Sequence, residues 1–160
     1  MRVVCIVIIV FCSISFFAFP LRYKDDIKRA AGEFCVDPVL VAAVIRAESN
    51  FDARATSAKG ARGLMQLLPS TAEFVAGLVS MDAYELENSR DNIRLGTAYL
   101  RYLFDKFGDT RTVLIAYNAG EGNVVRWLGD GDVLTGSPFP ETNAYVERVL
   151  NAMNYYRLRF

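Results

Sequence analysis

A single carboxylate stands at the end of a long apolar stretch in this sequence. The segment VAAVIRA, residues 41–47, is followed directly by Glu48. Such a stretch is typical of a buried helix, and a helix C-terminus carries the negative end of the backbone dipole. Burial and the dipole both disfavour a charged carboxylate, so the pKa of Glu48 is expected to rise. A carboxyl group that stays protonated near neutral pH can act as a general acid.

Two other interpretations of Glu48 are open: a solvated residue at a helix end, or a side chain that bonds the following loop.

The amino-acid composition limits the chemistry that the chain can perform. The 160 residues include no histidine, which excludes Ser-His-Asp and Cys-His nucleophilic sites and His-ligated zinc. The nearest other acid, Asp52, lies just past the predicted helix without an apolar setting.

The charge balance excludes one class of partner. The chain has 18 Lys+Arg and 18 Asp+Glu, so no basic excess is available to neutralise phosphates, and we expect no nucleic acid partner.

Asp130, Asp132 and Glu141 match positions one, three and twelve of a calcium loop. Leu134 and Thr135 occupy the fifth position and the turn-glycine position, so we predict a solvated loop there, with no metal and no cofactor.

The N-terminus is strongly apolar. The segment from Val3 to Phe19 follows Arg2 and is close to the shortest length that spans a bilayer. No convincing small-x-small cleavage site follows it, so we predict an uncleaved signal-anchor or transmembrane segment at 1–20; a cleaved signal peptide is the alternative. Residues 21–160 are then one exported domain.

The remaining sequence reads as helices separated by Gly, Pro and Asn signals, with no sustained strand alternation. Asp37 is a predicted N-cap with Pro38 at the first helical position. The fold class is therefore all-α and compact, with about seven short helices. The predicted helices are Tyr23–Cys35, Pro38–Ala47, Pro69–Ala76, Asp91 or Asn92 to Phe107, Thr110–Asn118, Asn123–Leu128 and Thr142–Arg157.

Four separate motifs follow one another along the chain: ESNF…S…GARGLMQLLPSTA, NIRLGTAYLRYLF, AYNAG and ETNAYVERVL. Together, in this order, they resemble the soluble lytic transglycosylases. These are bacterial enzymes with a compact lysozyme-like (goose-type) helical domain. The resemblance runs from about Tyr23 to Tyr156 and covers nearly the whole predicted exported part. It implies the lysozyme-like fold, peptidoglycan glycan strands as the substrate, and a domain that works as a monomer at the cell envelope.

The resemblance also implies roles for eight residues. Glu48 matches the catalytic acid of the family, and the other seven match positions that line its sugar groove. Several of these seven residues also have a plainer interpretation, as a polar loop residue, core filler, a helix cap or an N-terminal helix charge. The predicted substrate-binding residues are Ser57, Met65, Gln66, Tyr117, Asn118, Glu141 and Tyr145. Ala53, Leu68 and Glu121 depart from the usual family pattern, and Glu121 adds a charge near the groove.

Three functions compete at this stage. A lytic transglycosylase would cut the β-1,4 bond from N-acetylmuramic acid to N-acetylglucosamine with Glu48 as acid and then base, leaving 1,6-anhydro ends. A muramidase of the same fold would use water and a second carboxylate, for which Glu141 is the candidate. A non-catalytic glycan-binding module is the third. We expect the protein at the outer face of the cytoplasmic membrane, or secreted if the N-terminal segment is cleaved.

Overall fold

The computed structural model describes residues 21–129 and 134–160. The predicted membrane segment at 1–20 and the calcium-loop candidates Asp130 and Asp132 lie outside these residues. The described helices are α2 (Lys24–Phe34), α3 (Pro38–Ser49), α4 (Pro69–Leu78), α5 (Ser89–Phe107), α6 (Thr110–Ala119), α7 (Glu121–Leu128) and α8 (Pro140–Tyr156). Within the same residues there is no β-strand, and no helix combines the length and apolarity needed to cross a bilayer. The all-α prediction is confirmed for the described part of the chain.

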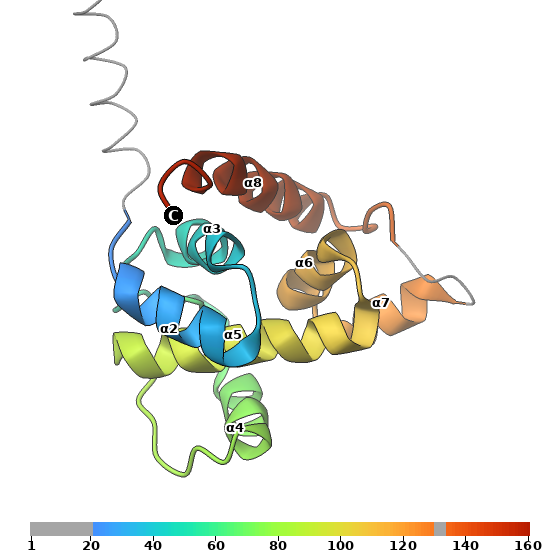
Figure 1. Cartoon of the computed structure of the whole chain (residues 1–160). Coiled ribbons are helices and arrows are strands. Elements are labelled where there is room, and N and C mark those ends of the chain that lie inside the picture. The colour runs from blue at the N-terminus through green and yellow to red at the C-terminus, as the bar shows by residue number, and fades with distance from the viewer. Residues whose placement is uncertain (1–20, 130–133) are drawn as a thin grey trace, which may run out of the picture.

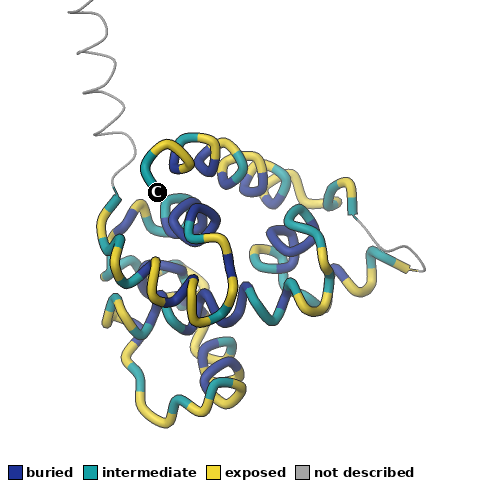
Figure 2. The backbone as a smooth tube through the Cα atoms, in the orientation of Figure 1, coloured by how far each residue is buried: buried dark blue, intermediate teal, exposed yellow. Residues whose placement is uncertain are grey.

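Helix α3 runs through the middle of the domain, between α2 and α8 (Figure 1). The Asp37 carboxylate caps it by accepting the Val39 N–H at 2.8 Å, and Pro38 opens its first turn, as predicted. Every residue from Val39 to Ile45 is buried, which Figure 2 shows as continuous dark blue along α3. Glu48 therefore lies one turn beyond a fully buried stretch of helix, where the helix becomes partly exposed.

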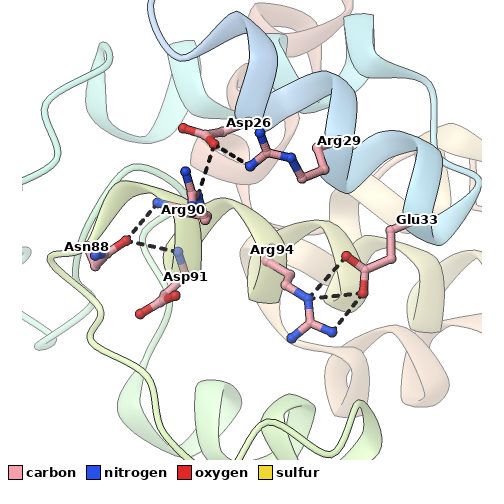
Figure 3. A network of polar contacts seen from close by, with 7 residues as sticks. All are labelled: Asp26, Arg29, Glu33, Asn88, Arg90, Asp91 and Arg94. Carbon is pink, nitrogen blue, oxygen red and sulfur yellow. Dashed lines mark hydrogen bonds and ion pairs between the residues drawn. The ribbon is translucent and has the colours of Figure 1, made fainter.

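Helix α5 is the long support of the domain, and it contacts α2, α4 and α6. Ion pairs join it to α2: Arg94 makes a forked contact with Glu33 at 2.7–3.1 Å, and Arg90 meets Asp26 at 3.3 Å (Figure 3). These pairs are largely exposed, so each contributes little to stability. The apolar side of α2, led by the fully buried Ile27, holds the two helices together.

Several predicted helix ends were wrong by a few residues. Helix α5 begins at Ser89 because Asn88 is its N-cap and accepts the Arg90 and Asp91 N–H groups. Helix α4 continues through Gly77, which was predicted to stop it. Helices α7 and α8 each begin two residues earlier than predicted. None of these shifts moves a predicted site residue from a helix into a loop.

The loop between α3 and α4 is irregular but tightly bonded. Isolated bridges pair Thr56 with Arg62 and Arg62 with Leu67. The buried Asn92 of α5 holds the loop from beneath: its Oδ1 accepts the Met65 N–H at 2.7 Å. Its Nδ2 donates to the carbonyl oxygens of Arg62 and Leu86 at 3.0 and 2.9 Å. This amide fixes the GLMQ segment over α5.

Candidate active site

A cavity of about 380 Å³ opens beside the C-terminal end of α3. Its walls come from the end of α3, the loop after it, the start of α4, the middle of α5 and the junction of α6 with α7. Five of the eight predicted site residues line it: Glu48, Ser57, Gln66, Tyr117 and Asn118. Glu48 supplies the one carboxylate among the described residues of this lining. The arrangement therefore offers a single acidic group to a ligand.

The setting of Glu48 favours its protonated form. Burial raises the pKa of Glu48 to about 7, while the Tyr145 hydroxyl and the positive charge of Arg148 oppose the rise. Burial outweighs both partners because the Glu48 carboxyl is largely withdrawn from solvent in the cavity wall. Glu48 therefore holds a proton through the acidic range and releases it near neutrality, as a general acid must.

Tyr145 of α8 stands behind Glu48, where its side chain is 2% exposed. Its hydroxyl is close enough to lower the pKa of Glu48, yet the two groups do not meet in the geometry of a full hydrogen bond. The hydroxyl has no partner among the described residues. A buried polar atom without a partner is costly, and such atoms concentrate at functional sites. Tyr145 is thus placed to support Glu48 from α8 and not to line the cavity.

Tyr117 of α6 is held by the loop opposite. Its hydroxyl donates to the Met65 carbonyl oxygen at 2.8 Å, and its ring lies 5.4 Å from that of Tyr99 between centroids. Burial and the nearby Glu48 raise the pKa of Tyr117 well above its usual value, so it stays neutral. The hydroxyl oxygen can still accept a hydrogen bond from a donor in the cavity.

Tyr117→Phe is expected to lower kcat/KM about tenfold, because the ring stays while the hydroxyl that fixes it to Met65 is removed. The unfolding free energy should fall by only about 1 kcal/mol, the usual net value of one hydrogen bond. Product release and urea unfolding measure the two effects. Tyr84→Phe, a tyrosine outside the cavity lining, is the matched control. An unchanged rate would leave Tyr117 as a purely structural residue.

Gln66 lines the cavity, and its side-chain amide also bonds the loop. Its Nε2 donates to the carbonyl oxygens of Ala55 and Gly63, both at 2.9 Å, so the donor half of the amide holds the loop. The backbone of Gln66 is in the left-handed region, with φ 48°. Its Oε1 accepts no bond from the described residues, which leaves only the acceptor half for a ligand.

Ser57 and Asn118 also line the cavity. The Ser57 Oγ accepts the Ala61 N–H at 3.0 Å, which closes a tight loop and leaves the hydroxyl proton unused by described residues. The Asn118 Oδ1 accepts the Thr142 hydroxyl at 2.9 Å and so joins α6 to α8. Asn118 is not the helix cap that its position before Ala-Gly suggested, because Gly120 ends α6.

Besides Tyr145, two more predicted residues are not in the cavity wall, Met65 and Glu141. The Met65 side chain is fully buried and packs against Gly96, where an added Cβ would come within 2.4 Å of its sulfur. Only the backbone of Met65 serves the site, through its carbonyl bond to Tyr117. Glu141 is exposed in the first turn of α8 and does not line the cavity. Its plainer interpretation, an acid at a helix N-terminus, fits this placement.

Sequence reasoning assigned no role to several residues that line the cavity, among them Tyr99, Thr71 and Lys59. Tyr99 lies within the GTAYL part of a quoted motif. Its side chain is 9% exposed and reaches the cavity beside Tyr117. A tyrosine on the inner face of a long helix was the available signal.

The raised pKa of Glu48 predicts how activity depends on pH. Because the free enzyme must carry the proton, kcat/KM should hold below pH 7 and fall tenfold per pH unit well above it, with an apparent pKa of about 7. The profile is measured as the rate of product formation over a range of pH, with circular dichroism at each pH to confirm the fold. A descending limb near the ordinary value of 4.5, or a rate that is flat from slightly acidic to slightly basic pH, would contradict it.

The Transglycosylase SLT domain family model matches residues 25–134 of the chain. The chain is also 36% identical over 151 residues to the soluble lytic murein transglycosylase of Escherichia coli (strain K12), an alignment that covers 87% of this chain and 23% of that protein. The chain therefore belongs to the transglycosylase SLT domain family. It spans about a quarter of the length of this relative.

Solved structures give the same result for the fold. The 70 kDa soluble lytic transglycosylase in complex with bulgecin A matches with a TM-score of 0.81 at 37% identity. An inactive glutamate-to-glutamine mutant of lytic transglycosylase Slt from Pseudomonas aeruginosa matches with a TM-score of 0.79 at 33% identity. Each alignment covers 88% of this chain and 25% of the other. The predicted lysozyme-like helical domain is confirmed.

Proposed function

We propose that this chain is a peptidoglycan lytic transglycosylase that cleaves the β-1,4 bond between N-acetylmuramic acid and N-acetylglucosamine. The observation that carries the proposal is one carboxyl group, Glu48, with a pKa of about 7 in a cavity whose described lining holds no second acid. Ordinary glycosidases need two carboxylates across the bond. A single acid that later becomes the base suits a reaction in which the substrate supplies its own nucleophile.

The proposed reaction has two proton transfers at one residue. The protonated Glu48 gives its proton to the leaving glycosidic oxygen as the bond to C1 of the muramoyl residue breaks. The resulting carboxylate takes the proton of the muramoyl 6-hydroxyl, whose oxygen bonds C1. The product is a 1,6-anhydro end, Glu48 regains its proton, and no water is consumed.

The neighbours of Glu48 have supporting roles in this proposal. Tyr145 and Arg148 stabilise the carboxylate formed midway, because both already favour the charged form. The Ser57 hydroxyl and the Gln66 Oε1 are placed at the cavity to bind sugar hydroxyl and amide groups. Tyr117 and Asn118 line the same cavity.

A hydrolytic muramidase is the rival within the same fold. It requires a second carboxylate to hold the attacking water. Glu141 was the candidate for this role, and Asp52 is the nearest other acid in the sequence. Glu141 is exposed and outside the cavity lining. Asp52 is exposed, and its Oδ1 accepts the Arg54 N–H at 2.9 Å. Both observations favour the transglycosylase.

The same proposal extends to the setting of the protein. Peptidoglycan glycan strands are the partner, and the protein acts alone at the bacterial cell envelope. The apolar segment at 1–20 anchors residues 21–160 at the outer face of the cytoplasmic membrane. A cleaved signal peptide would instead give a secreted enzyme.

The test is digestion of purified peptidoglycan by the full chain, followed by mass spectrometry of the released muropeptides. A lytic transglycosylase yields 1,6-anhydromuramoyl ends. A muramidase yields free reducing ends, one water heavier, and that result would replace the proposal by its rival. Binding without any cleavage would support the non-catalytic module.

A further inference from the structure

A cluster of aromatic and charged side chains lies where the cavity ends. It consists of Phe74 on α4, Tyr102 and Lys106 on α5, and Glu121 at the start of α7, and we call it the outer cluster. None of the four lines the cavity itself. Glu121 is also one of the positions where the sequence departs from the usual family pattern.

The outer cluster continues both walls of the cavity. Thr71 lines one wall, and Phe74 lies one helical turn further along α4. Gly120 lines the other wall, and Glu121 is the next residue. Tyr102 joins the two sides, since its ring lies 5.1 Å from that of Phe74 and its hydroxyl donates to Glu121 at 3.0 Å.

An aromatic row also connects the outer cluster to the catalytic end. The rings of Tyr117 and Tyr99 lie 5.4 Å apart, and those of Tyr99 and Tyr102 lie 6.2 Å apart and nearly parallel. Helices α4 and α5, which carry Phe74 and Tyr102, are in contact with each other; Figure 1 shows α4 beside α5. The row therefore leads from the wall beside Glu48 to the outer cluster without a break.

The outer cluster has the chemistry of a sugar site. Phe74 is 43% exposed although it is aromatic, so a ring surface is open to solvent. Lys106 pairs with Glu121 at 2.6 Å, and the same Glu121 Oε2 accepts the Tyr102 hydroxyl. The Glu121 Oε1 accepts no bond from the described residues. A pyranose presents apolar C–H groups on its faces and hydroxyls around its edge, which match an exposed ring beside a carboxylate and an ammonium group.

We propose that the outer cluster is a further glycan subsite, in which Phe74 packs against a sugar ring and Glu121 with Lys106 binds its hydroxyl groups. The proposal rests on the proposed function, because it takes the polymer cut at Glu48 as the occupant. The subsite binds the strand beyond the sugars at the cleaved bond. It makes the enzyme prefer long strands over short fragments.

The experiment compares kcat/KM on long purified glycan strands and on a tetrasaccharide of the same repeat. The quantity compared is the ratio of kcat/KM on long strands to kcat/KM on the tetrasaccharide. For Phe74→Ala, this ratio should fall about tenfold relative to wild type, the effect of one lost stacking contact. Glu121→Pro removes the carboxylate at the first helical position, where proline is tolerated, and should lower the ratio about threefold. Leu78→Ala, exposed on the same helix but outside the outer cluster, should keep the wild-type ratio.

Wild-type ratios in folded Phe74→Ala and Glu121→Pro proteins would overturn the subsite while leaving the proposed function intact. If the wild-type protein cleaves neither substrate, the proposed function fails and the subsite is tested by binding. Calorimetry with uncleaved long strands should then show about tenfold weaker binding for Phe74→Ala than for wild type. Equal affinities would overturn the subsite in that case too.

Discussion

Glu48→Gln is expected to lower anhydromuropeptide release by at least about a hundredfold, the usual scale of general acid catalysis. Glutamine keeps the shape and much of the hydrogen-bonding capacity of the side chain, but it has no acidic proton to give. The variant should fold and still bind glycan strands, because the other residues that line the cavity are unchanged. Release is measured by mass spectrometry at matched concentrations of variant and wild type, with circular dichroism to confirm the fold.

The same substitution should change stability in a pH-dependent way. The folded protein holds the Glu48 proton up to about pH 7, whereas the unfolded chain releases it near 4.5. The native state therefore binds more protons between these values, and wild-type stability falls as pH rises through that window. Glu48→Gln lacks this penalty, so its advantage over wild type should grow from about pH 4.5 and level off above pH 7.

Glu85→Gln, at an exposed position of the loop before α5, is the matched control and should alter neither release nor the pH dependence. Near-normal release from a folded Glu48→Gln protein would contradict the single-acid mechanism. It would point to Asp52 or Glu141 as the catalytic acid, in spite of their exposure.

Local signals predicted the helices well and their ends less well. Asp37 and Pro38 mark the start of α3 because a cap and a fixed φ are properties of single residues. The start of α5 was harder, since the segment ENSRDN holds several residues that can cap. Asn88 caps the helix, while Asn92 is buried inside it to bond the loop. A choice between two asparagines depends on what packs beneath them, which local sequence does not contain.

Some residues of the candidate site could also be predicted from local sequence, whereas others depend on packing between distant segments. The position of Glu48 at the end of a buried helix follows from the apolar run alone, and the structure adds the burial that raises its pKa. Met65 and Tyr145 depend on contacts between distant segments. Met65 turns inward over Gly96, and Tyr145 approaches Glu48 from α8, so neither orientation could be deduced from spacing.

Asn92→Ala should have the largest effect on stability, a loss of about 4 kcal/mol in the unfolding free energy. The Asn92 side chain is fully buried and satisfies three backbone groups of the Arg62, Met65 and Leu86 segments. Alanine leaves these groups without partners in the interior, at about 1–3 kcal/mol each before relaxation. Urea unfolding measures the loss, and Asn154→Ala on the exposed side of α8 should change stability by less than about 0.5 kcal/mol.

Gly63→Ala tests the same contact from the loop side. Gly63 has φ +77°, and a Cβ there would lie 2.2 Å from the Asn92 Nδ2 and from the Leu86 carbonyl oxygen. Alanine is therefore strained both by its backbone and by its neighbours, and a loss similar to that of Asn92→Ala is expected. The double variant should lose less stability than the sum of the two single losses, since each substitution disrupts the same contact. Full additivity, or a loss under about 1 kcal/mol for Asn92→Ala, would show that the GLMQ segment is held by its own loop bonds instead.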